Sequence, residues 1–165
     1  MEMFLCLLFW TCQQPFDTID HIILLHRLHN DFGIQGTALD WFSSCLTNRT
    51  QSVSIHCYTF DPAPISFGVP QGSVLGPVLF VLYTAFLSTV IEKHSVLHHS
   101  YADDSQLQKS ARPHQIPDFL SMQKCIDDTK SWLTLNKLKL NDDKTEAMIV
   151  SSGRKSRSLF PSQTL

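Results

Sequence analysis

The sequence predicts an α+β domain in which a largely antiparallel sheet is backed by helices. Segments with helical and with strand periodicity follow one another in mixed order, as in folds that do not alternate strictly. Two short segments, Val96–Tyr101 and Ser105–Lys109, flank a few polar residues, which is typical of a tight antiparallel hairpin. The chain has 165 residues, of which 43% are hydrophobic and 17% charged, so it can bury the core of one globular domain.

The chain is expected to begin with a buried strand. Met1–Trp10 is rich in Phe, Leu and Cys, as fully buried strands are. It is shorter than the roughly 20 apolar residues that a membrane-spanning helix needs. A secretory leader would start with a positive charge, whereas this chain has Glu2. A membrane or secretory address is the alternative interpretation of this segment.

Two helices and a strand are predicted next. Apolar residues recur at helical spacing over His21–Phe32, and Gly33 is typical of a helix C-terminus. A second helical pattern starts at Thr37, a good N-terminal residue, and extends to Leu46. Gln51–Tyr58 alternates between apolar and polar side chains, so it is predicted to be a half-buried strand.

The second half of the chain contains the longest predicted helices. A glycine-rich loop at Gly68–Gly76 leads into a helix at Pro77–Glu92 that is apolar nearly all round and is therefore expected to be buried. Another long helix starts at Pro117, and Ala147–Val150 is expected to be the last strand. The tail of residues 151–165 is rich in Ser, Lys and Arg and is expected to be disordered.

Charge and cysteine content restrict the function classes. The net charge is -2, which disfavours a free-standing nucleic-acid binder, since such proteins carry a basic face. The cysteines number five and show no CxxC spacing, so neither a zinc site nor a disulfide framework is expected. We interpret them as free thiols in a reducing, intracellular compartment, and we expect neither secretion nor a membrane partner.

Two adjacent carboxylates, Asp103 and Asp104, occupy the predicted hairpin turn. Like charges this close repel each other unless a cation lies between them. Mg²⁺ binds carboxylates together with substrate phosphates, so the pair points to metal-assisted phosphoryl transfer. The alternative is a solvated turn, because Asp is a common turn residue.

Five segments carry a resemblance to a known family. They are PFDTIDH at Pro15–His21, FGIQGTALDWFSSCLTNRTQSV at Phe32–Val53, GVPQGSVLGPVLFVLYT at Gly68–Thr84, YADDSQL at Tyr101–Leu107 and LKLNDDKTE at Leu138–Glu146. In this order and spacing the chain resembles the reverse transcriptase domain of non-LTR (LINE-type) retrotransposons. The resemblance implies a polymerase palm over residues 15–150 with part of the fingers and no thumb, preceded by an atypical apolar N-terminus at residues 1–14.

The resemblance also implies a site. Asp103 would bind the catalytic Mg²⁺ ions, Asp104 would support that metal site, and Lys144 would act as a general acid toward pyrophosphate. Phe16 would exclude a 2′-hydroxyl. Gln71 and Gly72 would contact the nucleotide or template, since glycine lets the backbone approach nucleic acid. The alternative interpretations are that Phe16 is an ordinary core residue, that Lys144 is a surface lysine, and that the glycine-rich loop only caps the helix that follows it. The partners implied are an RNA template, a DNA primer and dNTP.

One departure from the family pattern is central. The third metal ligand of the family is an aspartate five residues before the aromatic residue, and here that position is Thr11. A neutral hydroxyl does not balance two dications as a carboxylate does. We therefore expect little or no polymerase activity from this chain, and weak affinity for template and primer. The rival hypothesis is a non-catalytic remnant that binds nucleic acid or a protein partner.

Overall fold

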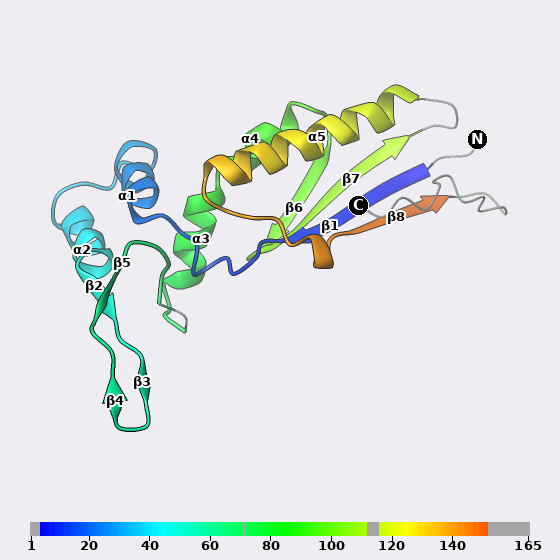
Figure 1. Ribbon diagram of the computed structural model, residues 1–165. Helices are drawn as coiled ribbons and strands as arrows, with labels where there is room; N and C mark the ends of the chain where they lie inside the picture. Colours follow the sequence, from blue (N-terminus) through cyan, green and yellow to red (C-terminus); the bar gives the residue numbers. More distant parts are fainter. Residues whose placement is uncertain (1–3, 71, 112–115, 152–165) are drawn as a thin grey trace.

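The computed structural model describes residues 4–70, 72–111 and 116–151. Within them a four-stranded antiparallel sheet has the order β6-β7-β1-β8 (Figure 1). The strands are β1 Phe4–Thr11, β6 Leu97–Tyr101, β7 Asp104–Ala111 and β8 Glu146–Ser151. The α+β class with an antiparallel sheet and helices on it is confirmed.

The first strand lies in the middle of this sheet. β1 pairs with β7 along its whole length and with β8 from Phe4 to Phe9. Its sequence is apolar at nearly every position, so apolar side chains lie on both of its faces. Leu8 and Trp10 are buried. The predicted strand is confirmed from Phe4 onward, but it is not buried throughout, since Leu5, Leu7 and Phe9 are half-buried. Residues 1–3 lie outside the described residues.

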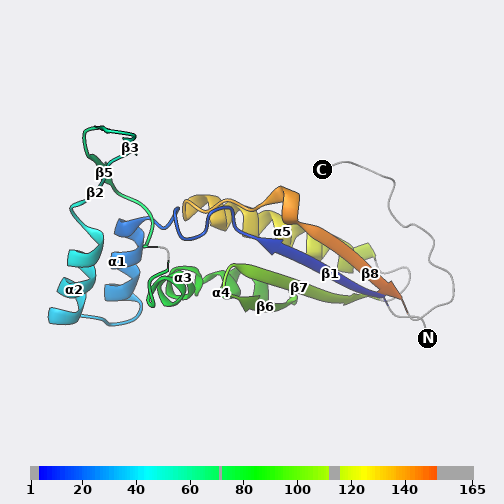
Figure 2. The same ribbon diagram turned by 90° about the horizontal axis from the view of Figure 1, so that it is seen from below.

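Helices cover one face of the sheet. α4 (Leu87–Glu92) and α5 (Ile116–Leu135) pack against each other and against β6 and β7 respectively (Figures 1 and 2). Leu107 of the sheet, with Ile91 and Leu133 of these helices, is fully buried in the common core. On the opposite face, several apolar side chains are exposed: Leu97, Tyr101, Met148 and Val150. No helix that the structure describes is long and apolar enough to cross a membrane.

The remaining helices lie at the other end of the molecule. They are α1 (His21–Asn30), α2 (Thr37–Leu46) and α3 (Gly76–Thr84), and α1 packs on both of the others. The side chain of Asp20 caps α1 by accepting hydrogen bonds from two backbone N–H groups of the first turn. α1 ends before Phe32, and Gly33 follows it with φ 68°, so the predicted helix and its C-terminal glycine are confirmed within a few residues.

A buried arginine ties this helical end to α5. The guanidinium carbon of Arg27 lies 5.0 Å from the ring centroid of Tyr83 and 5.1 Å from that of Trp132. Arg27 Nη2 donates to the Asn136 side chain, and the Tyr83 hydroxyl donates to the Asn136 carbonyl at 2.7 Å. Because these residues come from α1, α3 and the end of α5, the network fixes the two parts of the domain together.

The prediction of one half-buried strand at Gln51–Tyr58 is wrong. The chain turns back at His56–Cys57, so β3 (Ser54–Ile55) pairs with β4 (Tyr58–Thr59) in a hairpin. His56 adopts φ 56°, which allows a two-residue turn. Nearer the body, β2 (Arg49–Gln51) pairs with β5 (Ala63–Ile65). The apolar residues are exposed because the hairpin projects away from the core.

The prediction of one helix at Pro77–Glu92 is also corrected. The helix breaks at Ala85 and Phe86 into α3 and α4, because α3 packs on α1 whereas α4 must reach α5 and β6. Val78 and Val81 are 51% and 52% exposed, so α3 is not buried all round. The tail expected to be disordered lies outside the described residues from residue 152 on.

Candidate active site

The paired aspartates lie where the sequence placed them, at the tip of the hairpin formed by β6 and β7. Tyr101 and Asp104 are the last paired residues, so Ala102 and Asp103 form a two-residue turn. Ala102 has φ 54°, a conformation that residues with a Cβ rarely adopt. The turn leaves the side chain of Asp103 half-buried and that of Asp104 exposed.

Thr11 faces this turn from the neighbouring strand. In the register of β1 and β7 it lies opposite Asp104, and its hydroxyl donates to Asp103 Oδ2 at 3.0 Å. The Cys12 carbonyl is a second acceptor at 3.2 Å. The hydroxyl has one proton, and the nearer acceptor is the charged one, so the bond to Asp103 is the stronger. The residue at the expected position of a third carboxylate therefore contacts the aspartate directly.

The thiol of Cys12, next to Thr11, is influenced by the charge of the aspartate turn. Burial, and in second place the negative charge of Asp103, raise the pKa of Cys12 to about 12. Cys12 is consequently a neutral thiol at physiological pH and is a poor nucleophile and metal ligand. Among the described residues there is no cluster of three or more His, Cys, Asp or Glu side chains that could hold a metal ion.

An open cavity of about 500 Å³ adjoins the aspartate turn. Its lining includes Thr11, Tyr101, Asp104, Lys144 and Glu146. Lys144 ends a short 3₁₀ helix, η1 (Asp142–Lys144), which is held beside β1 because the Asn141 N–H donates to the Thr11 carbonyl at 2.8 Å. One cation, Lys144, and two carboxylates, Asp104 and Glu146, therefore share one concave surface. Sequence reasoning singled out Lys144 but missed Glu146, although it lies two residues further in the same segment.

Phe16 and the glycine-rich loop form a second group, which does not line that cavity. The Phe16 ring packs on Phe80 with centroids 5.8 Å apart. The Gly68 N–H donates to the Ile19 carbonyl and the Val69 N–H to the Phe16 carbonyl, both at 2.7 Å. A Cβ on Gly68 would meet backbone atoms of residues 16 and 17 at 3.1 Å. The loop thus starts directly on the backbone of the Phe16 segment, where only glycine fits.

Two further residues, which sequence reasoning missed, secure the start of this loop. His21 Nε2 lies 2.7 Å from the Gly68 carbonyl oxygen, and Arg49 Nη1 donates to the same oxygen at 3.3 Å. His21 is the last residue of the PFDTIDH segment, which is the only signal the sequence offered for it. Gly72 is exposed with φ 76° and open space around it. Gln71 lies outside the described residues.

Comparison with known proteins assigns the family. The sequence profile described as "Reverse transcriptase (RNA-dependent DNA polymerase)" matches residues 5–160. The chain belongs to the reverse transcriptase family. The match includes the aspartate turn, the glycine-rich loop and Lys144, so the expected resemblance is confirmed over nearly the whole chain.

Two relatives are polymerases of mobile elements. The chain is 30% identical over 141 residues to the RNA-directed DNA polymerase from mobile element jockey of Drosophila melanogaster. It is 31% identical over 142 residues to the protein of the same description from Drosophila funebris. Each match covers 82% of this chain and 15% of the relative. These relatives agree with the non-LTR assignment, and the chain spans about one seventh of their length.

Solved telomerase structures share the fold. A telomerase from Candida tropicalis, in complex with a TWJ fragment of telomeric RNA, superposes with a TM-score of 0.69 at 14% identity and covers 93% of this chain and 27% of that one. An apo telomerase from the same organism, truncated from its C-terminal domain, superposes with a TM-score of 0.66 at 15% identity. This match covers 92% of this chain and 32% of the telomerase chain. At these identities the likeness shows the fold alone, which is that of a partial reverse transcriptase palm.

Proposed function

We propose that this chain is the central part of a reverse transcriptase palm whose metal site is incomplete, so that by itself it has little or no polymerase activity. The ancestral reaction is the addition of deoxynucleotides to a DNA primer on an RNA template. The family assignment supports the reaction class. The chain spans only 15% of the curated relative from Drosophila melanogaster, so the activity of the whole protein is a proposal for this chain.

The hydrogen bond between Thr11 and Asp103 carries the proposal. Thr11 lies on the central strand, directly opposite Asp104, where a carboxylate would complete a group of three acidic side chains. A hydroxyl at this place contributes a hydrogen bond to one aspartate but no negative charge. Removing a charge that stabilises metal-bound phosphates is equivalent to a loss of several kcal/mol, or roughly a thousandfold or more in rate.

The residues present do not fit two magnesium ions. Two carboxylates are available at the turn, and one oxygen of Asp103 is already hydrogen-bonded to Thr11. Two dications in one site require more negative ligands than this pair offers. The proposal therefore assigns magnesium no catalytic role in the chain as it stands, although Mg²⁺ is the ion expected in the intact family site.

Substrate-contact roles are proposed for the two groups separately. Lys144 lies on the cavity beside Asp104 and is the proposed contact for a triphosphate. Phe16 and Gly72 belong to the second group, which does not line that cavity. Phe16 is proposed to contact the sugar, and Gly72 is proposed to contact the template. Phe16 is half-buried against Phe80, which gives the ring a fixed position, as a steric gate requires. Gln71, which directly precedes Gly72 in the glycine-rich loop, is also proposed to contact the nucleotide or template.

Primer extension tests the main proposal. The full chain is incubated with an RNA template, a labelled DNA primer, dNTPs and Mg²⁺ or Mn²⁺, beside the Thr11→Asp variant and a Thr11→Asn control. We expect no extension by the natural chain or by Thr11→Asn. Robust template-dependent extension by the natural chain would overturn the proposal, since Thr11 would then be compatible with catalysis.

A second candidate, nucleic-acid binding without catalysis, is favoured by one observation. Lys137, Lys139 and Lys144 are all exposed on the segment that leads from α5 past the cavity to β8. Phosphate contacts by lysines produce an affinity that falls steeply with salt. Fluorescence anisotropy with a labelled RNA–DNA hybrid at several salt concentrations tests this candidate. An affinity that falls with salt in the natural chain, and is lost in a variant with all three lysines changed to Gln, would show such binding.

A further inference from the structure

One peptide unit at the start of the glycine-rich loop, the one that joins Gly68 to Val69, is held at both of its polar ends. Its carbonyl oxygen accepts hydrogen bonds from His21 Nε2 at 2.7 Å and from Arg49 Nη1 at 3.3 Å. Its N–H, which belongs to Val69, donates to the Phe16 carbonyl at 2.7 Å. Because a carbonyl oxygen has two lone pairs, both are engaged and the plane of this peptide is fixed.

Glycine makes this external support important. Gly68 has φ 83°, and a residue without a Cβ adopts many backbone conformations at little cost. Without side-chain contacts to fix it, the direction of the Gly68 carbonyl depends on the groups that bind it. The Gly68 N–H is held as well, because it donates to the Ile19 carbonyl at 2.7 Å. Hydrogen bonds from other segments therefore set the direction in which the loop leaves the Phe16 segment.

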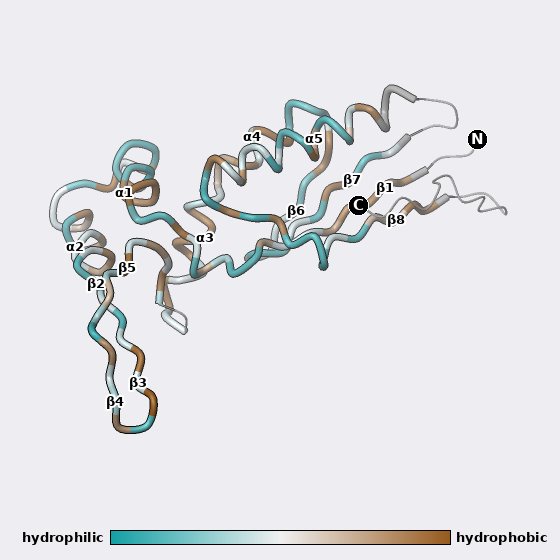
Figure 3. Tube along the Cα trace, viewed as in Figure 1, coloured by the Kyte–Doolittle hydropathy of each residue, from teal (hydrophilic) through white to brown (hydrophobic). Residues whose placement is uncertain are grey.

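The two donors of the Gly68 carbonyl belong to regular secondary structure. His21 is buried and is the first residue of α1, directly after the capping Asp20. Since a carbonyl oxygen only accepts, His21 Nε2 carries a proton, which assigns the tautomer of the neutral ring. Arg49 is half-buried and begins β2, at the base of the two-stranded ribbon of residues 49–65. The hydrophobic stretches of this ribbon lie further out, in β3 and around its turn (Figure 3). Both donors are thus held in place by elements outside the loop.

The loop returns to Phe16 at its other end. A Cβ on Gly76 would lie 3.8 Å from Phe16 Cδ1, and the Gly76 N–H donates to Ser73 Oγ at 3.0 Å. The exposed Gly72 therefore belongs to a loop whose two ends both adjoin Phe16. The groups that fix the first peptide of the loop thus also fix the loop and the Phe16 segment relative to each other.

We propose that His21 and Arg49, here called the carbonyl clamp, are positioning residues. They hold the glycine-rich loop and the Phe16 segment together in the arrangement that meets the template and the nucleotide sugar. What the loop and Phe16 contact rests on the proposed function, whereas the clamp itself follows from the hydrogen bonds. Neither side chain of the clamp touches nucleic acid; each acts through the Gly68 carbonyl. His21 contributes more than Arg49, because its hydrogen bond is shorter and lies in buried surroundings.

Glycine signals offer a direct test, because the chain has only six glycines. In an NMR spectrum of the full chain with isotope-labelled glycine, Gly68, Gly72 and Gly76 report on the loop. Gly33 and Gly36, between α1 and α2, serve as internal references. For His21→Leu, which removes the stronger donor, we expect amide hydrogen exchange at Gly68 and Gly76 to become faster on the order of tenfold, with no change at the references. Matching circular dichroism would show that the variant is folded.

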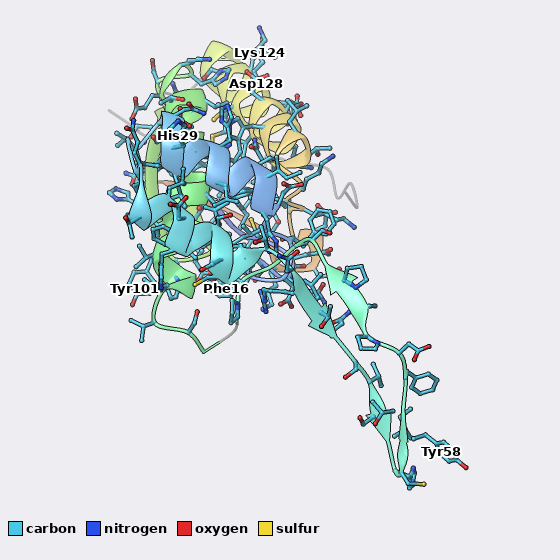
Figure 4. All side chains as sticks on the ribbon, turned by 90° about the vertical axis from the view of Figure 1, so that its left-hand side faces the viewer. Phe16, His29, Tyr58, Tyr101, Lys124 and Asp128 are labelled. Atoms are coloured by element: carbon cyan, nitrogen blue, oxygen red, sulfur yellow. The ribbon has the colours of Figure 1, made fainter. Side chains whose placement is uncertain are left out.

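Conservative variants separate positioning from folding. His21→Gln places an N–H at a similar reach and should return the exchange rates to within about twofold of those of the natural chain. Arg49→Met should accelerate exchange less than His21→Leu does, and Arg49→Lys, which keeps a donor, should reverse that change. The matched controls are His26→Leu, on the exposed side of the same helix, and Lys124→Met, at an exposed position of α5. Both should leave the loop signals unchanged, and Figure 4 shows Lys124 well apart from Phe16.

Titration of the same samples with an RNA–DNA hybrid tests what the carbonyl clamp serves. The Gly72 signal of the natural chain should shift as the hybrid is added. His21→Leu should need at least about fivefold more hybrid for the same shift, whereas His21→Gln should behave as the natural chain does. If the natural chain shows no shift, the template contact in the proposed function is wrong, and the exchange rates alone decide whether the clamp positions the loop.

Unchanged exchange at Gly68 and Gly76 in His21→Leu would overturn the positioning role. So would an equal acceleration at Gly33 and Gly36, or the absence of rescue by His21→Gln, since the histidine would then support the fold as a whole. A natural chain that binds the hybrid no more tightly than His21→Leu also contradicts the role, because the loop would then contact the template without the clamp.

Discussion

The hydroxyl of Thr11 donates a 3.0 Å hydrogen bond to the carboxylate of Asp103, across two neighbouring strands of the sheet. The bond gives the Asp103 carboxylate a donor on the neighbouring strand. A threonine at this place contributes to the folded turn, whereas the proposed function would need a carboxylate there for metal binding. The same contact makes Thr11 the position at which stability and metal affinity are expected to change in opposite directions.

Thr11→Asp should create a metal-dependent protein. Without metal, a third carboxylate beside Asp103 and Asp104 adds repulsion, and we expect a loss of about 1–2 kcal/mol in the free energy of unfolding. Saturating Mn²⁺ at about 100 times its dissociation constant should return about 2.7 kcal/mol. Thermal melting with EDTA and with Mn²⁺ measures both effects. The uncharged Thr11→Asn control should not respond to Mn²⁺, and a response equal to that of Thr11→Asp would contradict the idea.

Two glycines of the same loop should differ in their tolerance of alanine. Gly68 and Gly72 both have positive φ, 83° and 76°, but only Gly68 lies against backbone atoms. Gly72→Ala should cost about 1 kcal/mol from backbone strain alone, whereas Gly68→Ala should cost more than 2 kcal/mol because the contact with residues 16 and 17 must also open. Urea denaturation measures both. Equal losses would mean that the close contact is not maintained in solution.

Arg27 should be more important for its packing than for its charge. It is 8% exposed, lies between the rings of Tyr83 and Trp132, and its Nη1 has no hydrogen-bond partner among the described residues. Arg27→Ala should cost about 3 kcal/mol because it leaves a cavity between the rings. Arg27→Met, which fills the space without a buried charge, should cost less than half as much. A larger loss with Met than with Ala would contradict this reasoning.

Acidification should destabilise the fold through His98. Burial, and then the charge of His99, lower the pKa of His98 below its ordinary value of 6.5. The unfolded chain therefore takes up the proton first, and stability that is present above pH 6.5 is lost as pH falls through the folded pKa. His98→Gln should show a shallower fall in melting temperature below pH 6.5 than the natural chain. The exposed His26→Gln is the matched control, and an identical effect of both would disprove a specific role for His98.

The order of segments and their local patterns were sufficient for much of the fold. The apolar start of the chain favoured a buried strand over a membrane or secretory address, and the hairpin with two aspartates followed from short segments on either side of a polar turn. The resemblance to the family also drew attention to Thr11, because it implies a third carboxylate five residues before Phe16. These features depend on residues close together in sequence, for which periodicity and spacing are direct constraints.

Long-range packing decided what the sequence left open. The alternation in Gln51–Tyr58 is the same for a half-buried strand and for an exposed ribbon, since periodicity shows only that the two faces differ and not whether a core covers one. The uniformly apolar Pro77–Glu92 gave no signal of a break, because the break is set by where α1 and α5 lie. The contacts of His21 and Arg49 with the Gly68 carbonyl join distant segments.

The sequence by itself determined the family and the strand and turn that carry the aspartates, and it led to the expectation of a carboxylate at the position of Thr11. Only the tertiary structure decided that the Thr11 hydroxyl reaches Asp103, that Lys144 shares a cavity with Asp104, and that the apolar residues of the ribbon have no core to join. The physical reason is that hydrogen bonds and burial depend on the distance between side chains in space, which local patterns constrain only within a single element.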